Sequence, residues 1–367
     1  MGRENRGEHA SASGIASSST LASPTVIPSR LRGFARKPVG AVKSSRENLP
    51  NPPLKTRPET PEVSPTMKSI ARLGLTLAAA STLLFSLSTT EAADVPGVRR
   101  TEVIYGRKFG TALTLDVLQP ARTNGYAIIA VISGGFFSSH DGINPSYMKE
   151  ILDRGYTIFA VVHGSQPKFT IPEITQDMHR SVRWIRTHAA GYGVNPDKLG
   201  VFGGSAGGHL SLTLATQGGP GDAASKDAVD RASSAVQAVA CFFPPTDFEN
   251  WSAPGDTQVG IGKVGRAFHP AFGPRSEVLE ERLKLGPEIS PIHGLKKETP
   301  PTLIVHGDAD KLVPIYQAEI YKKKADAVGA TVRVDVKPGA DHGWANMDKD
   351  LATFADWFDA HLRGISK

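Results

Sequence analysis

The stretch Val201-Phe-Gly-Gly-Ser-Ala-Gly-Gly-His209 stands between an apolar run and a run that is compatible with a helix. We interpret it as a buried strand over 198–202, a very sharp turn at Ser205 and a helix over about 207–216. Such a turn would present the serine hydroxyl at the N-terminus of the helix. The stretch therefore predicts a nucleophilic serine, and the alternative is a glycine-rich turn that contains a serine by chance.

Two glycines and one alanine complete this predicted turn. A side chain at position 203 or 207 would collide with the neighbouring strand or helix, so Gly203 and Gly207 are expected to be required there. The backbone N–H of Ala206 should point the same way as the Ser205 hydroxyl. Ala206 is therefore a predicted donor to an oxyanion.

Apolar runs and helical patterns alternate from about residue 94 onward, which predicts an α/β fold with a mostly parallel, doubly wound sheet. One catalytic domain accounts for 94–367. The predicted strands are an opening hairpin at 102–105 and 112–118, then 126–133, 157–162, 236–243, 302–306 and 331–336. The predicted helices are 144–153, 173–190, 315–328 and 349–362. The less regular segment 244–299, with a charged helix around 276–285, is interpreted as a small insertion over the active site.

The basic excess of the chain lies in its first segment. Residues 1–66 are rich in Ser, Pro, Arg and Gly and carry ten Lys and Arg against five Asp and Glu, whereas 94–367 carry thirty of each. We expect 1–66 to be a disordered basic tail, because it has few apolar residues to bury. The balanced charge of the domain gives no reason to expect a nucleic-acid partner.

Residues 67–93 have the layout of a secretory signal, with a positive start, the uncharged run 73–90 and small residues at the end. We interpret Met67 as the true start and 1–66 as a mis-assigned upstream segment; an uncleaved signal anchor is the alternative for 67–93. In both cases the domain is expected to be exported, periplasmic or secreted, and to touch a membrane only through such an anchor. The single cysteine, Cys241, is expected in a buried strand.

The strand predicted at 126–133 ends in Ser133-Gly-Gly-Phe-Phe137. Two glycines at the end of a central strand let the backbone fold back and expose its N–H groups. Gly135 and Phe136 are therefore the predicted source of a second oxyanion donor. An ordinary strand-ending turn is the alternative.

Ser205, Asp310 and His342 all follow the carboxyl ends of predicted strands, where open α/β sheets place their sites. Their chain order is that of the nucleophile-elbow architecture. A serine hydroxyl needs an imidazole to take its proton, and the imidazole needs an acceptor on its other nitrogen. His342 is the predicted base and Asp310 the predicted acid of this triad.

Other residues near these positions could take the same roles. Asp308 is an alternative for the triad acid, whereas Asp341 is expected to stabilise its loop. Three further histidines are weaker alternatives for the base, because a histidine at a strand end more often makes a structural hydrogen bond: His163, His209 and His306.

The motifs GGSAGGH at 203–209, HGDADKLVP at 306–314 and GADHGW at 339–344 resemble the α/β-hydrolase superfamily. The resemblance covers about 97–365 and is greatest to the esterase/lipase branch, with its acetyl-esterase-like, feruloyl-esterase-like and hormone-sensitive-lipase-like members. It implies a two-step reaction in which Ser205 attacks an ester carbonyl and water later releases the acyl group. No metal or organic cofactor is implied.

The chain departs from this pattern at the oxyanion loop. Many relatives carry His-Gly-Gly-Gly where this chain has Ser133-Gly-Gly-Phe136. The oxyanion hole is still expected, because backbone N–H groups supply it, and Phe136 is a candidate for narrowing the acyl pocket.

The sequence thus predicts a serine hydrolase of carboxylic esters with short acyl groups. Acetyl groups on polysaccharides are one candidate substrate, by family analogy and expected export. The expected partner is a small-molecule or carbohydrate ester. A prolyl-oligopeptidase-like serine peptidase and a catalytically silent binding module on the same fold are the alternatives.

Overall fold

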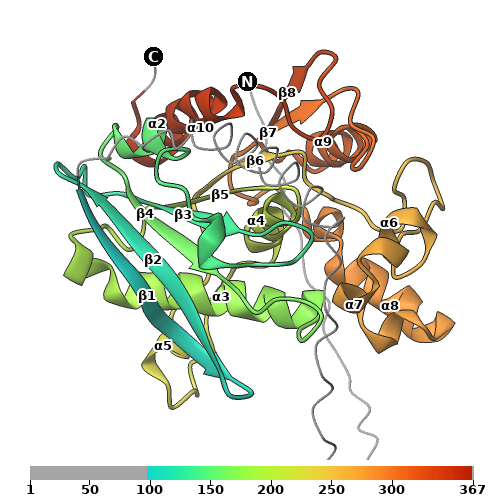
Figure 1. Ribbon diagram of the computed structural model, residues 1–367, viewed down its shortest axis with the longest axis horizontal. Helices are drawn as coiled ribbons and strands as arrows, with labels where there is room; N and C mark the ends of the chain where they lie inside the picture. Colours follow the sequence, from blue (N-terminus) through green and yellow to red (C-terminus); the bar gives the residue numbers. More distant parts are fainter. Residues whose placement is uncertain (1–96, 366–367) are drawn as a thin grey trace, which may run out of the picture. The chain divides into compact units, whose positions relative to one another are not determined.

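The computed structural model describes residues 97–365, and in it eight strands form one sheet in the order β1-β2-β4-β3-β5-β6-β7-β8 (Figure 1). β1 pairs antiparallel with β2, and β2 with β4. All other neighbours are parallel. The strands are β1 (Gly97–Lys108), β2 (Thr111–Pro120), β3 (Ala127–Ile132), β4 (Thr157–Val162), β5 (Leu199–Gly204), β6 (Ala238–Phe242), β7 (Thr302–Gly307) and β8 (Val332–Lys337).

The two faces of the sheet are covered by different helices, which confirms the doubly wound arrangement. Ile129 of β3 belongs to a core shared with α3, α4 and α9, whereas its neighbour Ile128 packs with α2 and α10. Strands buried on both faces have no polar side, which explains their continuous apolar runs. The α-helices of the described residues are α2 (Lys149–Leu152), α3 (Ile171–His188), α4 (Ala206–Gln217), α5 (Ala228–Arg231), α6 (Gly262–Ala267), α7 (His269–Phe272), α8 (Leu279–Ile289), α9 (Tyr316–Val328) and α10 (Leu351–Phe358).

The helix predicted over 144–153 is mostly wrong, because only its last turn forms, as α2. The Asn144 carboxamide oxygen accepts the N–H groups of Ser146 and Tyr147. This side-chain bonding favours a turn over a helix at that point.

The insertion between β6 and β7 contains α6, α7 and α8, which lie close together in Figure 1. The charged helix expected near 276–285 is α8, which starts at Leu279 and extends to Ile289. Cys241 lies in β6 as a fully buried free thiol, as predicted.

The predicted tail and the predicted signal segment both lie outside the described residues. Within 97–365, none of the helices combines the length and the apolar character needed to cross a membrane.

Candidate active site

The turn between β5 and α4 places Ser205 in a strained backbone conformation. Its φ is +53° and its ψ is −120°, a region that residues with a side chain rarely adopt. A Cβ on Gly203 would lie 2.5 Å from the Gly207 carbonyl carbon, and one on Gly207 would lie 2.7 Å from the Val131 oxygen. Both contacts are with backbone atoms that cannot swing away, so the local fold leaves room only for glycine at the two positions.

Replacing Gly207 by alanine is expected to destabilise the domain by about 1–3 kcal/mol and to lower any turnover that depends on Ser205, because β3 must move away from the new methyl group. Thermal unfolding and turnover would measure the two effects. Gly219→Ala is the matched control, since a Cβ there meets no atom within 4 Å. Equal behaviour of the two variants would contradict the steric explanation.

Three side chains predicted from separate parts of the chain meet above this turn. His342 Nε2 lies 3.0 Å from Ser205 Oγ, and His342 Nδ1 lies 2.7 Å from Asp310 Oδ2. The Asp310 side chain is fully buried, and that of His342 is 19% exposed. The order nucleophile, imidazole and carboxylate is the one that proton transfer from a serine requires.

The carboxylate of Asp310 is held as an anion by several donors. Burial by itself would raise the pKa of Asp310. Hydrogen bonds from His306, His342 and the Val313 N–H outweigh burial and hold the pKa well below its usual range. The other carboxylate oxygen accepts the N–H groups of Leu312 and Val313 at 2.8 and 2.9 Å. Asp310 can therefore stabilise a positive charge on His342 at neutral pH.

The alternative acids do not contact the imidazole. Asp308 is exposed, and its Oδ1 accepts the Gly339 N–H at 2.6 Å. Asp341 Oδ1 accepts the backbone N–H groups of Lys311 and His342, which ties two loops together.

The alternative histidines make structural hydrogen bonds instead. In each of them one ring nitrogen donates to a backbone carbonyl: His163 to that of Gly164, His209 to that of Ile289, and His306 to that of Val313. His306 also lies 3.4 Å from Asp310, so it supports the triad acid without approaching Ser205.

Burial makes three histidines sensitive to acid: His163 and His209, and also His179 of α3. It lowers the pKa of His163, His179 and His209 to about 4 each. The unfolded chain, in which histidine has its ordinary pKa near 6.5, then binds more protons than the folded chain. Their contribution to stability is complete above about pH 6.5 and is lost as the pH falls toward 4.

We therefore expect the free energy of unfolding to fall between pH 7 and 4, by at most about 3 kcal/mol for each of the three histidines. Urea unfolding at a series of pH values measures this change in the free energy of unfolding. His209→Gln should flatten the dependence, because the amide does not titrate. An unfolding free energy that stays constant over this range would contradict the prediction.

The oxyanion residues predicted from sequence line the same cavity as Ser205. Gly135 and Phe136 have φ of +54° and +65°, two successive left-handed residues. Gln166 holds both of their carbonyls, through its side-chain amide at 2.5 Å from the Gly135 oxygen and its backbone N–H at 3.2 Å from the Phe136 oxygen. Among the described residues, the N–H groups of Gly135, Phe136 and Ala206 have no acceptor. They are free to bind an oxyanion.

A cavity of about 430 Å³, here called the aromatic cavity, opens directly onto Ser205 and His342. Part of its wall, including Phe248, Trp251 and Phe268, comes from the insertion, which therefore lies over the active site as predicted. Its aromatic lining residues are Phe136, Phe243, Phe248, Trp251, Phe268 and Phe272.

Phe243 is an active-site residue that the sequence analysis missed. Its ring centroid lies 4.3 Å from that of His342, and its backbone has the unusual φ of +34°. A non-glycine residue with positive φ is strained, so the surrounding structure must hold it there. The only sequence signal was the run Phe242-Phe-Pro-Pro245 at a strand end, which does not indicate where the ring points.

One group among the described residues could hold a metal ion: Asp247, Glu249 and His293. The Asp247 carboxylate already accepts the N–H groups of Glu249 and Asn250 and the Asn250 side-chain amide. None of the three lines the aromatic cavity, so the triad chemistry does not involve them.

Comparison with known proteins agrees with this geometry. The family model BD-FAE matches residues 115–325. The probable carboxylic ester hydrolase LipM of Mycobacterium tuberculosis is 27% identical over 231 residues, 59% of this chain and 49% of LipM. The acetylxylan esterase of Xylanibacter ruminicola is 25% identical over 253 residues, 66% of this chain and 44% of that protein. The chain thus spans about half the length of the curated relatives that it matches.

One solved structure, a truncated carbohydrate esterase from gut microbiota, superposes with a TM-score of 0.61 and 26% identity. The superposition covers 72% of this chain and 96% of that one.

Proposed function

Because the chain belongs to the BD-FAE family of α/β-hydrolase esterases, we propose that it hydrolyses carboxylic esters through an acyl-enzyme on Ser205. The observation that carries the proposal is the continuous hydrogen-bonded path from Ser205 through His342 to Asp310, at 3.0 and 2.7 Å. A catalytically silent module would have no need of this path, and its presence favours catalysis over the binding-module alternative.

The reaction uses each of these groups in turn. Ser205 Oγ attacks the ester carbonyl carbon while His342 Nε2 takes its proton, and Asp310 stabilises the imidazolium. The oxyanion accepts hydrogen bonds from the N–H of Ala206 and from that of Gly135 or Phe136. The tetrahedral intermediate collapses, and the leaving alcohol takes the proton from His342. Water, activated by His342, then attacks the acyl-enzyme and releases the acid.

For the substrate, we propose esters of carbohydrates with small acyl groups, including acetyl. Two relatives whose names refer to carbohydrate esters support this choice, the acetylxylan esterase and the gut carbohydrate esterase. The superposition with the second covers almost all of that chain. The aromatic cavity offers an apolar site for the acyl group next to Ser205.

The test is hydrolysis by the purified full chain of chromogenic acyl esters of increasing chain length, with a proline-containing peptide amide in parallel. A fluorophosphonate probe followed by peptide mapping identifies the reactive residue. Ester turnover with the probe on Ser205 is the expected result. Cleavage of the peptide without ester preference would favour the peptidase alternative, and absence of turnover and of labelling would overturn the proposal.

We further propose that the domain acts outside the cytoplasm, on the basis of the signal-like segment 67–93. Expression of the full chain with its own N-terminus, followed by fractionation and N-terminal sequencing, tests this. Retention in the cytoplasm with segment 67–93 intact would overturn it.

A further inference from the structure

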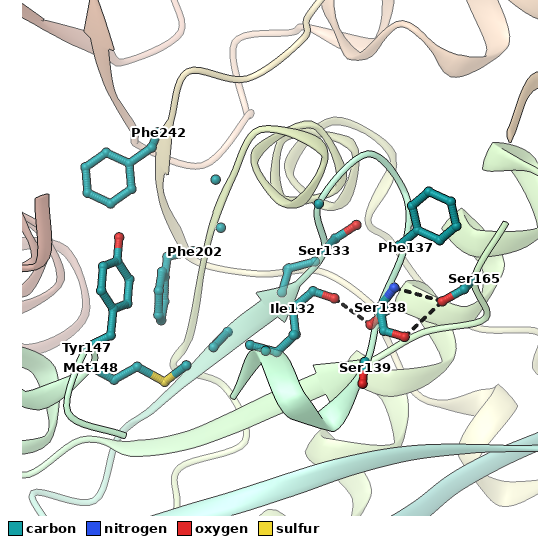
Figure 2. Close-up of a pocket in the computed structure, with 16 residues that line it drawn as sticks. Ile132, Ser133, Phe137, Ser138, Ser139, Tyr147, Met148, Ser165, Phe202 and Phe242 are labelled. Carbon is teal, nitrogen blue, oxygen red and sulfur yellow. Dashed lines mark hydrogen bonds between the residues drawn. The ribbon is translucent and has the colours of Figure 1, made fainter. Parts of the chain in front are cut away.

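A second cavity, of about 720 Å³, lies at the ends of β3, β5 and β6, next to the start of α2 (Figure 2). It is larger than the aromatic cavity, and the triad does not line it. Its lining contains the aromatic rings of Tyr147, Phe202 and Phe242. Phe137, which follows the oxyanion residues Gly135 and Phe136, also lines it and is 53% exposed.

The two cavities share a wall made of Ser133, Gly134 and Gly204. Gly134 precedes the oxyanion residues, and Gly204 precedes the nucleophile. A Cβ on Gly134 would meet no atom within 4 Å, and one on Gly204 would meet nothing closer than 3.6 Å. Gly134 therefore borders open space, whereas a Cβ on Gly204 would touch the side chains of Phe242 and Phe243. Neither glycine has a side chain that separates Ser205 from the second cavity.

The lining of the second cavity also includes the hydroxyl groups of several serines and of Tyr147. Ser133 Oγ is buried and has no hydrogen-bond partner among the described residues. Ser138 and Ser165 differ, because the Ser138 hydroxyl donates to the Ile132 carbonyl and the Ser165 hydroxyl to the Ser138 carbonyl, as the dashed lines of Figure 2 show. A buried hydroxyl without a partner costs free energy, which a bound polar group would recover.

From these observations we propose that the second cavity binds the alcohol half of the ester, and that this half is a sugar unit. The inference rests on the proposed esterase function. At the carbonyl carbon the acyl and alkoxy groups must diverge. The aromatic cavity has no polar side chain besides Ser133, Ser205 and His342, and it suits the acyl group.

The alkoxy oxygen must lie near His342 Nε2 to receive its proton, and the open space beside Gly134 lets the rest of the alcohol extend toward the second cavity. A sugar presents C–H faces, which pack against the rings of Tyr147 and Phe202, and hydroxyl groups, which bond to Ser133 and Tyr147. This mixture of apolar and polar surface matches the lining.

The experiment compares two substrates with the same acyl group, ethyl acetate and an acetylated xylo-oligosaccharide. Gly134→Val should place a side chain between the cavities and lower kcat/KM for the sugar ester at least tenfold more than for ethyl acetate. Tyr147→Phe should raise KM for the sugar ester severalfold more than for ethyl acetate. The matched controls are Gly191→Ala, where a Cβ also meets no atom within 4 Å, and Tyr126→Phe, at a half-buried tyrosine that lines neither cavity.

The outcomes separate this inference from the proposed function. If the wild-type protein hydrolyses both esters but the variants change both by the same factor, or change neither, the assignment of the second cavity is overturned and the esterase function stands. Hydrolysis of ethyl acetate without any hydrolysis of the sugar ester would also overturn it. If the wild-type protein hydrolyses neither ester, both proposals fail. Thermal unfolding of each variant shows that a loss is not a loss of folding.

Discussion

Ser205→Ala is expected to lower kcat for a short chromogenic ester by roughly 10⁶-fold, the effect seen when a triad nucleophile is removed. Without Oγ no acyl-enzyme can form, and His342 has no hydroxyl from which to take a proton. The oxyanion donors and the cavities stay in place, so a small residual rate over uncatalysed hydrolysis should survive. Steady-state kinetics with a protein preparation free of wild-type enzyme measures the loss.

Ser211→Ala is the matched control for this variant. Ser211 lies on the same helix, α4, and is also buried, but its hydroxyl donates only to the Gly207 carbonyl at 2.8 Å. Its removal should leave kcat within a few-fold of the wild-type value, because the lost hydrogen bond is neutral and local. If Ser205→Ala kept turnover comparable with that of Ser211→Ala, Ser205 would not be the nucleophile.

The positions of Ser205, Asp310 and His342 could be predicted because short local motifs place each of them at the end of a strand. The run 158–162 is apolar, and β4 (Thr157–Val162) contains it. Such runs locate the parallel strands, and parallel strands bring their carboxyl ends to one edge of the sheet. The sharp turn at Ser205 needs glycine at fixed offsets, which is a steric requirement that can be read from three residues.

The surroundings of the triad could not be anticipated in the same way. Gln166 holds the oxyanion loop from a segment that follows a different strand, and the Phe243 ring reaches His342 only through the folded arrangement of β6 and β8. These contacts join residues that are far apart in the chain and have no motif of their own. The second cavity is also a product of packing, since it depends on which side chains fail to fill the space.

The local sequence pattern also led to one wrong prediction, the helix over 144–153. The spacing of apolar residues in 144–153 suits a helix, but the Asn144 side chain bonds to the following N–H groups and the chain turns instead. The loop that results ends next to Tyr147 and Met148, which line the second cavity. A local hydrogen bond that competed with the helix thus helped to shape a candidate substrate site.

Asp310→Asn is expected to lower kcat by about 10⁴-fold with a much smaller effect on KM. The carboxamide keeps the volume of the carboxylate but carries no charge, so it cannot stabilise the imidazolium that forms on His342. It also offers an N–H where His342 Nδ1 donates, which favours the wrong tautomer of the imidazole. The low pKa of Asp310 means that the wild-type carboxylate stays ionised even in mildly acidic solution. Kinetics with a short ester from pH 6 to 9 would measure the loss.

Asp308→Asn is the control that distinguishes the two candidate acids. Asp308 is exposed, and its carboxylate accepts the Gly339 N–H and does not touch His342. An asparagine oxygen can accept the same hydrogen bond, so kcat should change by only a few-fold. A loss of turnover larger in Asp308→Asn than in Asp310→Asn would assign the triad acid to Asp308 instead. Equal and small losses would mean that His342 works without a carboxylate partner, contrary to the 2.7 Å contact between His342 and Asp310.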